Sequence, residues 1–239
     1  MLDFHVHLAR LPRPERLSLE LIEKGYRAVI VACEPWEWEK TERLLPIWKK
    51  SAIPCFGIHP MIAGVFDKKR LNELRELLKK HPEAFVGECG IDKRFPGYGP
   101  GEIQEEVFRF QARLSLELRR PLMIHVVGNH RRVLGILEDE GFSASAPQAI
   151  FHRFGGDRET VNRAMLLDPI FSLHPDSFRK ASTRDALSLI PQERIRFETD
   201  ADENLFPATA DFLVCQLKAV SEHFRHWNSC RFQGSISYF

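Results

Sequence analysis

The stretch Leu2-Asp3-Phe4-His5-Val6-His7, at residues 2–7, decides the fold prediction, because it reads as a short buried strand that ends in two histidines. His5 and His7 stand two positions apart, so their side chains point to the same side of a strand. The next segment, residues 8–12, contains no glycine. It therefore lacks the glycine-rich turn after a first strand that would favour an open, doubly wound sheet.

Similar short apolar segments recur along the chain, and amphipathic segments with a helical period lie between them. Strands are predicted at residues 2–5, 28–32, 54–58, 85–88, 122–125, 149–151, 170–173 and 195–198. Helices are predicted at residues 14–24, 36–49, 68–79, 102–117, 130–140, 158–166, 184–189 and 208–224. Eight strand–helix units predict a parallel sheet with right-handed crossovers. We therefore expect an α/β protein whose residues 1–239 form one domain, a (β/α)8 TIM barrel, with an open doubly wound sheet as the alternative.

Size and composition agree with this expectation. The chain has 239 residues, and barrels of this kind have about 250. Hydrophobic residues make up 44% of the chain and charged residues 28%, as in ordinary globular proteins. The apolar runs are too short to span a bilayer, and the N-terminus does not resemble a signal peptide. We expect a cytoplasmic protein that does not associate with membranes.

The cysteines and the net charge bear on the redox environment of the protein and on its contact with nucleic acid. The five cysteines are scattered, odd in number and form no CxxC pair: Cys33, Cys55, Cys89, Cys215 and Cys230. This pattern favours reduced thiols over a disulfide framework. The net charge is +1, whereas proteins that bind nucleic acid mainly through phosphates have a strong basic excess. Any contact with nucleic acid is therefore expected to be local to a site.

Histidines and acids gather at the C-terminal ends of the predicted strands, which is where barrel active sites lie. Seven of the eight strand ends carry at least one such residue, and only the second does not. The residues at these ends are His5, His7, His59, Glu88, Asp92, His125, His152, His174, Glu198 and Asp200. Their convergence on one rim predicts an active site.

Imidazoles and carboxylates that converge on one point are suitable ligands for divalent transition ions. A single ion would use three or four of these groups, and enough are present for two ions bridged by Glu88. Two metals a few ångströms apart can activate a water and stabilise both oxygens of a displacement. Histidine-rich ligation favours Zn²⁺, Mn²⁺ or Fe²⁺, although a mixed site also accepts Mg²⁺ weakly.

Other polar residues receive less specific interpretations. His174 is weighed evenly between lining the site and a structural role. His81, His130, His223 and His226 are expected at the surface. Arg153 is interpreted as a solvated salt-bridge residue, with compensating charge near the site as the alternative. Cys89, next to Glu88, is interpreted as a small packing residue.

Several motifs, taken together and in this order, resemble the TatD family of metal-dependent hydrolases and deoxyribonucleases, within the amidohydrolase-like superfamily. They are DFHVHL at 3–8, GIHP at 57–60, GECGID at 87–92, Gln104, Val107, Phe108 and Gln111, PLMIH at 121–125, Phe151, His152, Phe154 and Gly156, and ETD at 198–200. The resemblance covers residues 3 to about 207.

The resemblance implies a role for each matching residue. His5 and His7 would hold one metal together with Asp200, and Glu88 would bridge both metals. His125 and His152 would hold the second metal. His59 would donate a hydrogen bond to a phosphoryl or carbonyl oxygen of the substrate. Asp200 would also accept the proton of the attacking water, so that the expected catalytic residues are Asp200, Glu88 and His59.

The chain departs from the family pattern around the substrate rather than at the metals. Val127 stands two positions after His125, where the family usually has a basic residue. Residues 200–203 read Asp-Ala-Asp-Glu instead of continuing with alanine and proline, no Arg-Asn segment follows Pro207, and residues 227–239 do not match the usual ending. Asp202 and Glu203 are expected to add negative charge near the mouth, which disfavours a polyanion unless metals offset it.

The leading hypothesis is a metal-dependent phosphodiesterase or deoxyribonuclease that uses a water activated by two divalent ions, Zn²⁺, Mn²⁺ or Mg²⁺. Its partner would be DNA or a small phosphoester or amide substrate. The first alternative is a small-molecule amidohydrolase that acts on a lactone, a cyclic amide or a phosphotriester. The second alternative is an inactive barrel that serves as a binding protein. The sequence does not predict the oligomeric state.

Overall fold

The computed structural model describes residues 1–234, with side chains through residue 229. Eight strands form one sheet in the order of the sequence, and each neighbouring pair is parallel. The strands are β1 (Leu2–Val6), β2 (Arg27–Ala32), β3 (Ala52–Phe56), β4 (Phe85–Asp92), β5 (Leu122–Val127), β6 (Ala149–Phe151), β7 (Pro169–Leu173) and β8 (Ile195–Phe197). This order has no crossover that skips a neighbour, as a barrel requires.

The sheet closes between β1 and the segment that follows β8. The backbone N–H of Asp200 donates to the carbonyl oxygen of His5 at 2.9 Å, and the N–H of His7 donates to the carbonyl oxygen of Ala201 at 2.9 Å. Val6 and Ala201 form an isolated parallel bridge at the same place. The predicted (β/α)8 barrel is therefore confirmed, and the open sheet is excluded.

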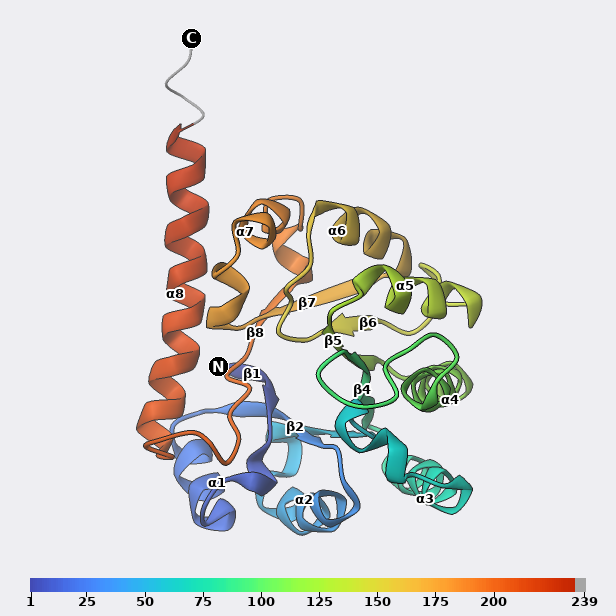
Figure 1. The fold of residues 1–239 in the computed structure, drawn as a ribbon. Coiled ribbons are helices and arrows are strands. Elements are labelled where there is room, and N and C mark those ends of the chain that lie inside the picture. Colours follow the sequence, from blue (N-terminus) through green and yellow to red (C-terminus); the bar gives the residue numbers. More distant parts are fainter. Residues whose placement is uncertain (235–239) are drawn as a thin grey trace.

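Helices follow the strands and surround them in chain order (Figure 1). They are α1 (Pro14–Glu23), α2 (Pro35–Trp48), α3 (Lys68–Lys80), α4 (Ile103–Leu118), α5 (His130–Asp139), α6 (Arg158–Ala164), α7 (Ala181–Leu187) and α8 (Ala210–Gly234). Short 3-10 segments η1 (Leu8–Arg10), η3 (Pro60–Val65) and η5 (Pro175–Phe178) follow β1, β3 and β7. None of the helices in residues 1–234 combines the length and apolarity that crossing a membrane requires.

Side chains cap the N-termini of α5 and α6, which lie at the rim where the predicted site residues gather. Asn129 accepts a hydrogen bond from the N–H of Arg132 at 3.0 Å at the start of α5. Asp157 accepts from the N–H of Thr160 at 2.9 Å at the start of α6. Such caps satisfy backbone donors that have no partner in the first turn. They fix where α5 and α6 start above the C-terminal rim of the barrel.

The interior of the barrel is filled by side chains, not open. Apolar residues that point inward from several strands form one buried cluster: Phe4, Val29, Val31, Cys33, Cys55, Met123, Ile150 and Ile170. The alternation along β2 places Val29, Val31 and Cys33 on the same side, since side chains on a strand alternate. Larger apolar clusters pack the helices against the outside of the sheet.

Some element bounds differ from the predicted ones. β4 continues to Asp92 rather than 88, because Cys89–Asp92 stay paired with β5. α7 begins at Ala181 rather than 184. The prediction started too late because the first turn is polar and shows no apolar period. α8 runs to Gly234 rather than 224, because neither proline nor glycine interrupts it earlier. Of the divergent C-terminal residues 227–239, the last five lie outside the described part of the chain.

Candidate metal centre

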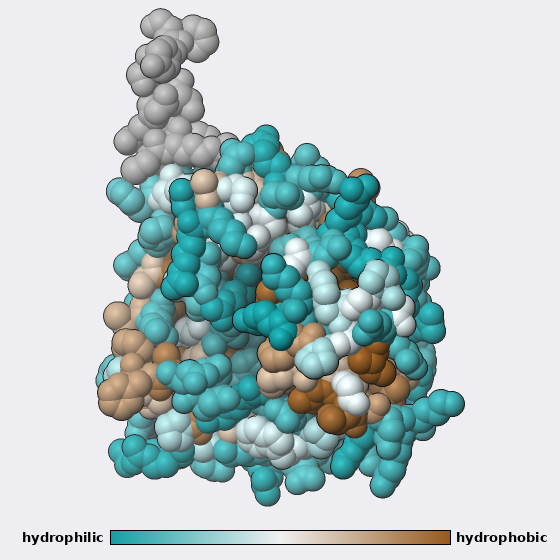
Figure 2. All heavy atoms as spheres, viewed as in Figure 1, coloured by the Kyte–Doolittle hydropathy of each residue, from teal (hydrophilic) through white to brown (hydrophobic). Residues whose placement is uncertain are grey.

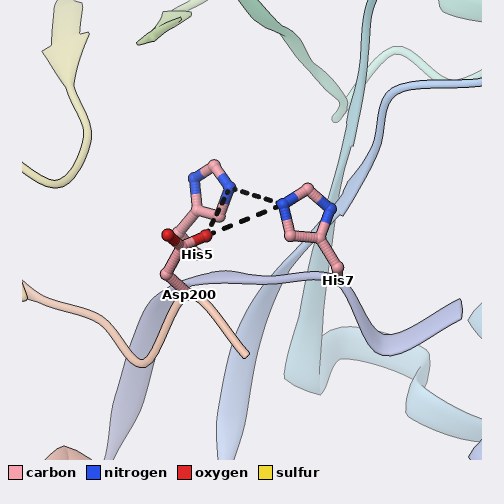
Figure 3. Close-up of side chains that lie close together, drawn as sticks. All are labelled: His5, His7 and Asp200. Atoms are coloured by element: carbon pink, nitrogen blue, oxygen red, sulfur yellow. Dashed lines mark hydrogen bonds and ion pairs between the residues drawn. The ribbon is translucent and has the colours of Figure 1, made fainter. Parts of the chain in front are cut away.

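The first ligand group lies where β1 ends and the chain after β8 closes the barrel (Figure 3). The Nε2 atoms of His5 and His7 are 3.2 Å apart. The Oδ1 atom of Asp200 lies 3.7 Å from each of these nitrogens. Three potential ligand atoms from sequence-distant segments therefore converge on one point, as the sequence predicts.

Glu88, on β4, lies between this group and a second pair of histidines. Its Oε2 atom is 3.3 Å from Nε2 of His5 and 3.5 Å from Nε2 of His7. Its Oε1 atom is 2.6 Å from Nδ1 of His125 and 2.7 Å from Nε2 of His152. One carboxylate thus faces two pairs of imidazoles, each through a different oxygen.

The close approach of neighbouring strands depends on glycine beside this carboxylate. Gly90 has a φ of +148°, and a Cβ there would lie 2.0 Å from the carbonyl oxygen of His125. A side chain at this position would push β4 away from β5 and separate Glu88 from His125. This packing accounts for the second glycine of the GECGID motif.

His59 follows β3 and directs one ring nitrogen into the site. Its Nδ1 accepts a hydrogen bond from the N–H of Met61 at 3.0 Å, so in the neutral ring the proton is on Nε2. Nε2 lies 3.7 Å from Oε1 of Glu88. Burial lowers the pKa of His59 to about 3. At neutral pH this residue is therefore an uncharged hydrogen-bond donor that faces the centre.

Two carboxylates orient the second histidine pair, and the sequence did not reveal these roles. Asp92 Oδ2 lies 2.9 Å from Nε2 of His125, and Arg94 binds Asp92 in turn. Glu198 Oε1 lies 3.3 Å from Nδ1 of His152. Carboxylates in this position fix the tautomer of a ligating histidine. Both acids belong to the motifs GECGID and ETD, which was the only available signal.

Asp3, on β1, binds the segment after β8 next to the first ligand group and so helps to close the barrel. It accepts hydrogen bonds from the N–H of Thr199 at 3.0 Å and the hydroxyl of Thr199 at 2.5 Å, and it also binds the hydroxyl of Tyr26. Burial outweighs these hydrogen bonds and raises the pKa of Asp3 to about 7. Asp3 stands two positions before His5, and Thr199 directly precedes Asp200. This contact therefore helps to place both ligands.

The residues present fit a divalent cation. Two imidazole nitrogens and two carboxylate oxygens converge at the first group: Nε2 of His5, Nε2 of His7, Oδ1 of Asp200 and Oε2 of Glu88. Burial lowers the pKa of His5, so its ring is neutral. Burial raises the pKa of Asp200, but the neighbouring histidines outweigh it and hold the pKa below the usual range. His5 and Asp200 are thus in the protonation states that metal binding requires. At His7 burial disfavours a charged imidazole, but the carboxylates of Glu88 and Glu37 outweigh it and raise the pKa, so a metal would have to displace a proton from that ring.

Both histidines of the second pair resemble His7 in their electrostatic state. Burial disfavours a charged imidazole at His152, but the carboxylates of Glu88 and Glu198 outweigh it and raise the pKa of His152. The carboxylates of Asp92 and Glu88 do the same at His125. Without a metal, protons therefore occupy this side of the centre. A metal bound here would have to displace them.

A cavity of about 840 Å³ opens above the centre. Hydrophilic residues surround the hollow in the middle of the face shown in Figure 2. Many basic side chains line the cavity: Arg10, Lys93, Arg94, Arg131, Arg153, Arg163, Arg179 and Lys180. Asp202 also lines it, as predicted, whereas Glu203 pairs with Arg10 at 3.6 Å. These basic side chains offset the negative charge that the sequence predicts at the mouth.

The remaining polar residues are now placed. Arg153 binds Oδ2 of Asp200 at 2.5 Å and also pairs with Asp176, so it forms salt bridges at the edge of the site itself. His174 caps η5 through the N–H of Asp176 and does not line the cavity, which indicates a structural role.

The surface prediction for four histidines is only partly right. His223 and His226 are exposed as expected. His81 is half-buried because it binds Glu42 at 2.7 Å. His130 is half-buried in the wall of the cavity, and burial lowers its pKa to about 4. The surface prediction was therefore wrong for His81 and His130.

The cysteines of the described part form no disulfide with one another. Cys33, Cys55, Cys89 and Cys215 are free, and the first three are buried. Cys89 packs inside the barrel wall, with its Sγ 3.6 Å from the carbonyl oxygen of Met123, as expected of a small packing residue. The side chain of Cys230 lies outside the described part.

Comparisons with known proteins place this chain in a family. A model described as "TatD related DNase" matches residues 2–222, which extends beyond about residue 207, where the resemblance seen in the sequence ends. A 3'-5' ssDNA/RNA exonuclease TatD of Pantoea ananatis is 33% identical over 176 residues, 72% of this chain and 66% of that protein. The human protein named Deoxyribonuclease TATDN3 is 25% identical over 217 residues, 84% of this chain and 77% of that protein.

Solved structures show the same fold. A TatD homologue from Escherichia coli K12 superposes with a TM-score of 0.71 at 20% identity, over 92% of this chain and 90% of the other. A TatD-family hydrolase from Entamoeba histolytica superposes with a TM-score of 0.71 at 17% identity, over 84% of this chain and 73% of the other. Since the family model covers nearly the whole chain, from β1 into α8, this protein belongs to the TatD family.

Proposed function

We propose that this protein is a metal-dependent phosphodiesterase that hydrolyses single-stranded nucleic acid with two divalent ions. The observation that carries the proposal is the position of Glu88, whose two carboxylate oxygens face two separate histidine pairs. A shared carboxylate is what a centre with two neighbouring metals needs. The related proteins named as exonuclease and deoxyribonuclease support the substrate class.

Each ion would have its own set of ligands. His5, His7, Asp200 and Oε2 of Glu88 would hold one ion, and Oε1 of Glu88, His125 and His152 would hold the other. Nitrogen-rich sets of this kind suit Zn²⁺, Mn²⁺ or Fe²⁺, and Mg²⁺ less well. When bound, such ions lower the pKa of a water molecule and stabilise negative charge on a phosphoryl group.

The chain's own residues would orient the substrate and move the proton. Asp200 directs one oxygen to the first histidine pair and the other to Arg153. Its depressed pKa keeps it ionised, so it can accept the proton of the attacking water. His59, neutral and protonated at Nε2, would donate a hydrogen bond to a phosphoryl oxygen. Arg153, 2.5 Å from Asp200, would provide positive charge next to that phosphate.

The charge of the cavity separates this proposal from the small-molecule alternatives. Lactones and cyclic amides are neutral and gain little from a wall of arginines and lysines, whereas a phosphodiester strand carries a charge at every link. Lys93, Arg131 and Lys180 line the cavity without an ion-pair partner in the described chain. They remain available for the phosphates of a bound strand.

The test combines metal analysis with a panel of substrates. Metal-loaded wild type is expected to cleave single-stranded oligonucleotides and a small phosphodiester such as bis(4-nitrophenyl) phosphate, but not lactones or cyclic amides. His5→Ala should lose metal, and Asp200→Asn should lose activity by about 10²-fold or more. Fewer than two bound ions per chain in the loaded wild type would overturn the two-ion proposal. Turnover of lactones alone would support the amidohydrolase alternative instead.

A further inference from the structure

Cys33 occupies the one strand end at which the sequence showed neither a histidine nor an acid. It follows β2 directly, and it points inward on the same side as Val29 and Val31. Its side chain is fully buried from solvent, yet it belongs to the lining of the cavity. The thiol therefore lies at the top of the packed barrel interior, directly below the metal centre.

The thiol faces the ligands of the first ion. Its Sγ lies 3.5 Å from Oε2 of Glu88, the oxygen that also faces His5 and His7. Ligand atoms of His7, Cys33 and Glu88 all lie within 4.8 Å of one another. The His7 nitrogen that faces this oxygen is Nε2, at 3.5 Å from Oε2 of Glu88. A nitrogen, a sulfur and an oxygen are thus within reach of one ion.

Neighbouring residues hold the thiol in this position. The N–H of Cys33 donates to Oε2 of Glu37 at 2.7 Å. Arg10 binds the same carboxylate, with its Nε 2.5 Å from Oε1 of Glu37, and the Glu37 side chain is fully buried. This brace connects η1, the end of β2 and the start of α2, so the position of Cys33 does not depend on a flexible loop.

We propose that Cys33 is a ligand of the ion held by His5 and His7, which it binds through its sulfur. This inference rests on the proposed two-metal function. On binding, the S–H bond breaks, a coordinate bond from sulfur to the metal forms, and the proton passes to solvent. A thiolate is a soft ligand, so this position prefers Zn²⁺, Fe²⁺, Co²⁺ or Cd²⁺ to Mg²⁺.

Cobalt substitution tests the proposal without an activity assay. The metal-free full-length protein is titrated with Co²⁺, and absorbance is followed in the near ultraviolet, where charge transfer from thiolate to Co²⁺ absorbs. Wild type is expected to show this band, and Cys33→Ser is expected to lose it while still binding Co²⁺. Cys89→Ser is the matched control, because Cys89 is equally buried but its Sγ contacts the Met123 carbonyl, and it should keep the band.

A competition measurement gives an independent readout. Cys33→Ser, or Cys33→Ala if serine in the core prevents folding, should lower the preference for Cd²⁺ over Mn²⁺ by about 10-fold or more. Wild type that binds Co²⁺ without the band, or a band that persists in Cys33→Ser, would overturn the role of Cys33 and leave the two-metal site intact. Wild type that binds no Co²⁺ would overturn both that role and the proposed function.

Discussion

The backbone N–H of Asp200 donates to the carbonyl oxygen of His5 across 2.9 Å. This bond joins the first strand to the end of the last one, and it sets the Asp200 carboxylate beside the two histidines of β1. Asp200 has a φ of +50°, a conformation that aspartate adopts more readily than most residues. Closure of the barrel and assembly of the first ligand group are therefore one structural event.

Loss of Asp3 should weaken both closure and metal binding. Asp3→Ala leaves the N–H and hydroxyl of Thr199 and the hydroxyl of Tyr26 without their buried acceptor. The free energy of unfolding should fall by about 3 kcal/mol, and the affinity for the first ion should fall with it. Urea titration and calorimetric metal titration measure the two effects. Tyr26→Phe, which removes one of these bonds, should cost only about 1 kcal/mol. An equal loss in both variants would contradict the role assigned to Asp3.

His59 should matter for turnover and not for metal content. His59→Ala removes the neutral donor that faces the centre, so kcat should fall by about 10²-fold while bound metal stays at the wild-type level. Steady-state kinetics and metal analysis on the same sample separate the two. The matched control is His81→Ala, since His81 binds Glu42 and does not line the cavity, and it should keep wild-type kcat. Loss of metal in His59→Ala would make His59 a ligand instead.

Asp92 should control metal affinity through His125. Asp92→Asn replaces the carboxylate 2.9 Å from Nε2 of His125 with an amide that orients the ring less strongly. The affinity for the second ion should fall by about 10- to 100-fold, as measured by competition with a chelator. Asp139→Asn changes an exposed acid on α5 and should leave affinity unchanged. Unchanged affinity in Asp92→Asn would show that this contact does not orient the histidine.

The outer helices should contribute a pH-dependent part of stability. Glu140, at the end of α5, binds Arg113 and Arg109 of α4. The hydrogen bond from Arg113 is the main reason why the pKa of Glu140 lies below its ordinary value. A lowered carboxylate pKa stabilises the fold above the unfolded value of about 4.3, and this contribution disappears as the pH falls through the folded pKa. Glu140→Gln should lower stability at pH 7 by at most about 1 kcal/mol, and by much less at pH 3. Thermal unfolding at several pH values checks this, and a constant difference down to pH 3 would contradict it.

The barrel and the ligand positions could be predicted because both follow from local pattern. Parallel strands bring their C-terminal ends to one rim, so His5, Glu88 and His125 were expected together without knowledge of any distance. Contacts that depend on how segments pack could not be predicted. The brace of Arg10 and Glu37 behind Cys33, and the salt bridge from Arg153 to Asp200, join residues whose spacing in sequence carries no signal.

The burial of His130 was missed for a related reason. A histidine that follows a helix cap and begins an amphipathic helix usually faces solvent. Here α5 starts at the rim, so its first residue turns into the wall of the cavity. The length of α8 was missed because the apolar period stops at Phe224, although the polar residues that follow are compatible with a helix.

Metal stoichiometry tests most directly the central claim, that Glu88 bridges two ions. Metal-free wild type and Glu88→Gln are each loaded with a divalent metal and dialysed, and their metal content is measured by inductively coupled plasma mass spectrometry. Glu140→Gln serves as the control for a charge change far from the centre. The account predicts two ions per chain in wild type and in the control, and no more than one weakly held ion in Glu88→Gln. A single ion in wild type, or two ions held with unchanged affinity in Glu88→Gln, would contradict it.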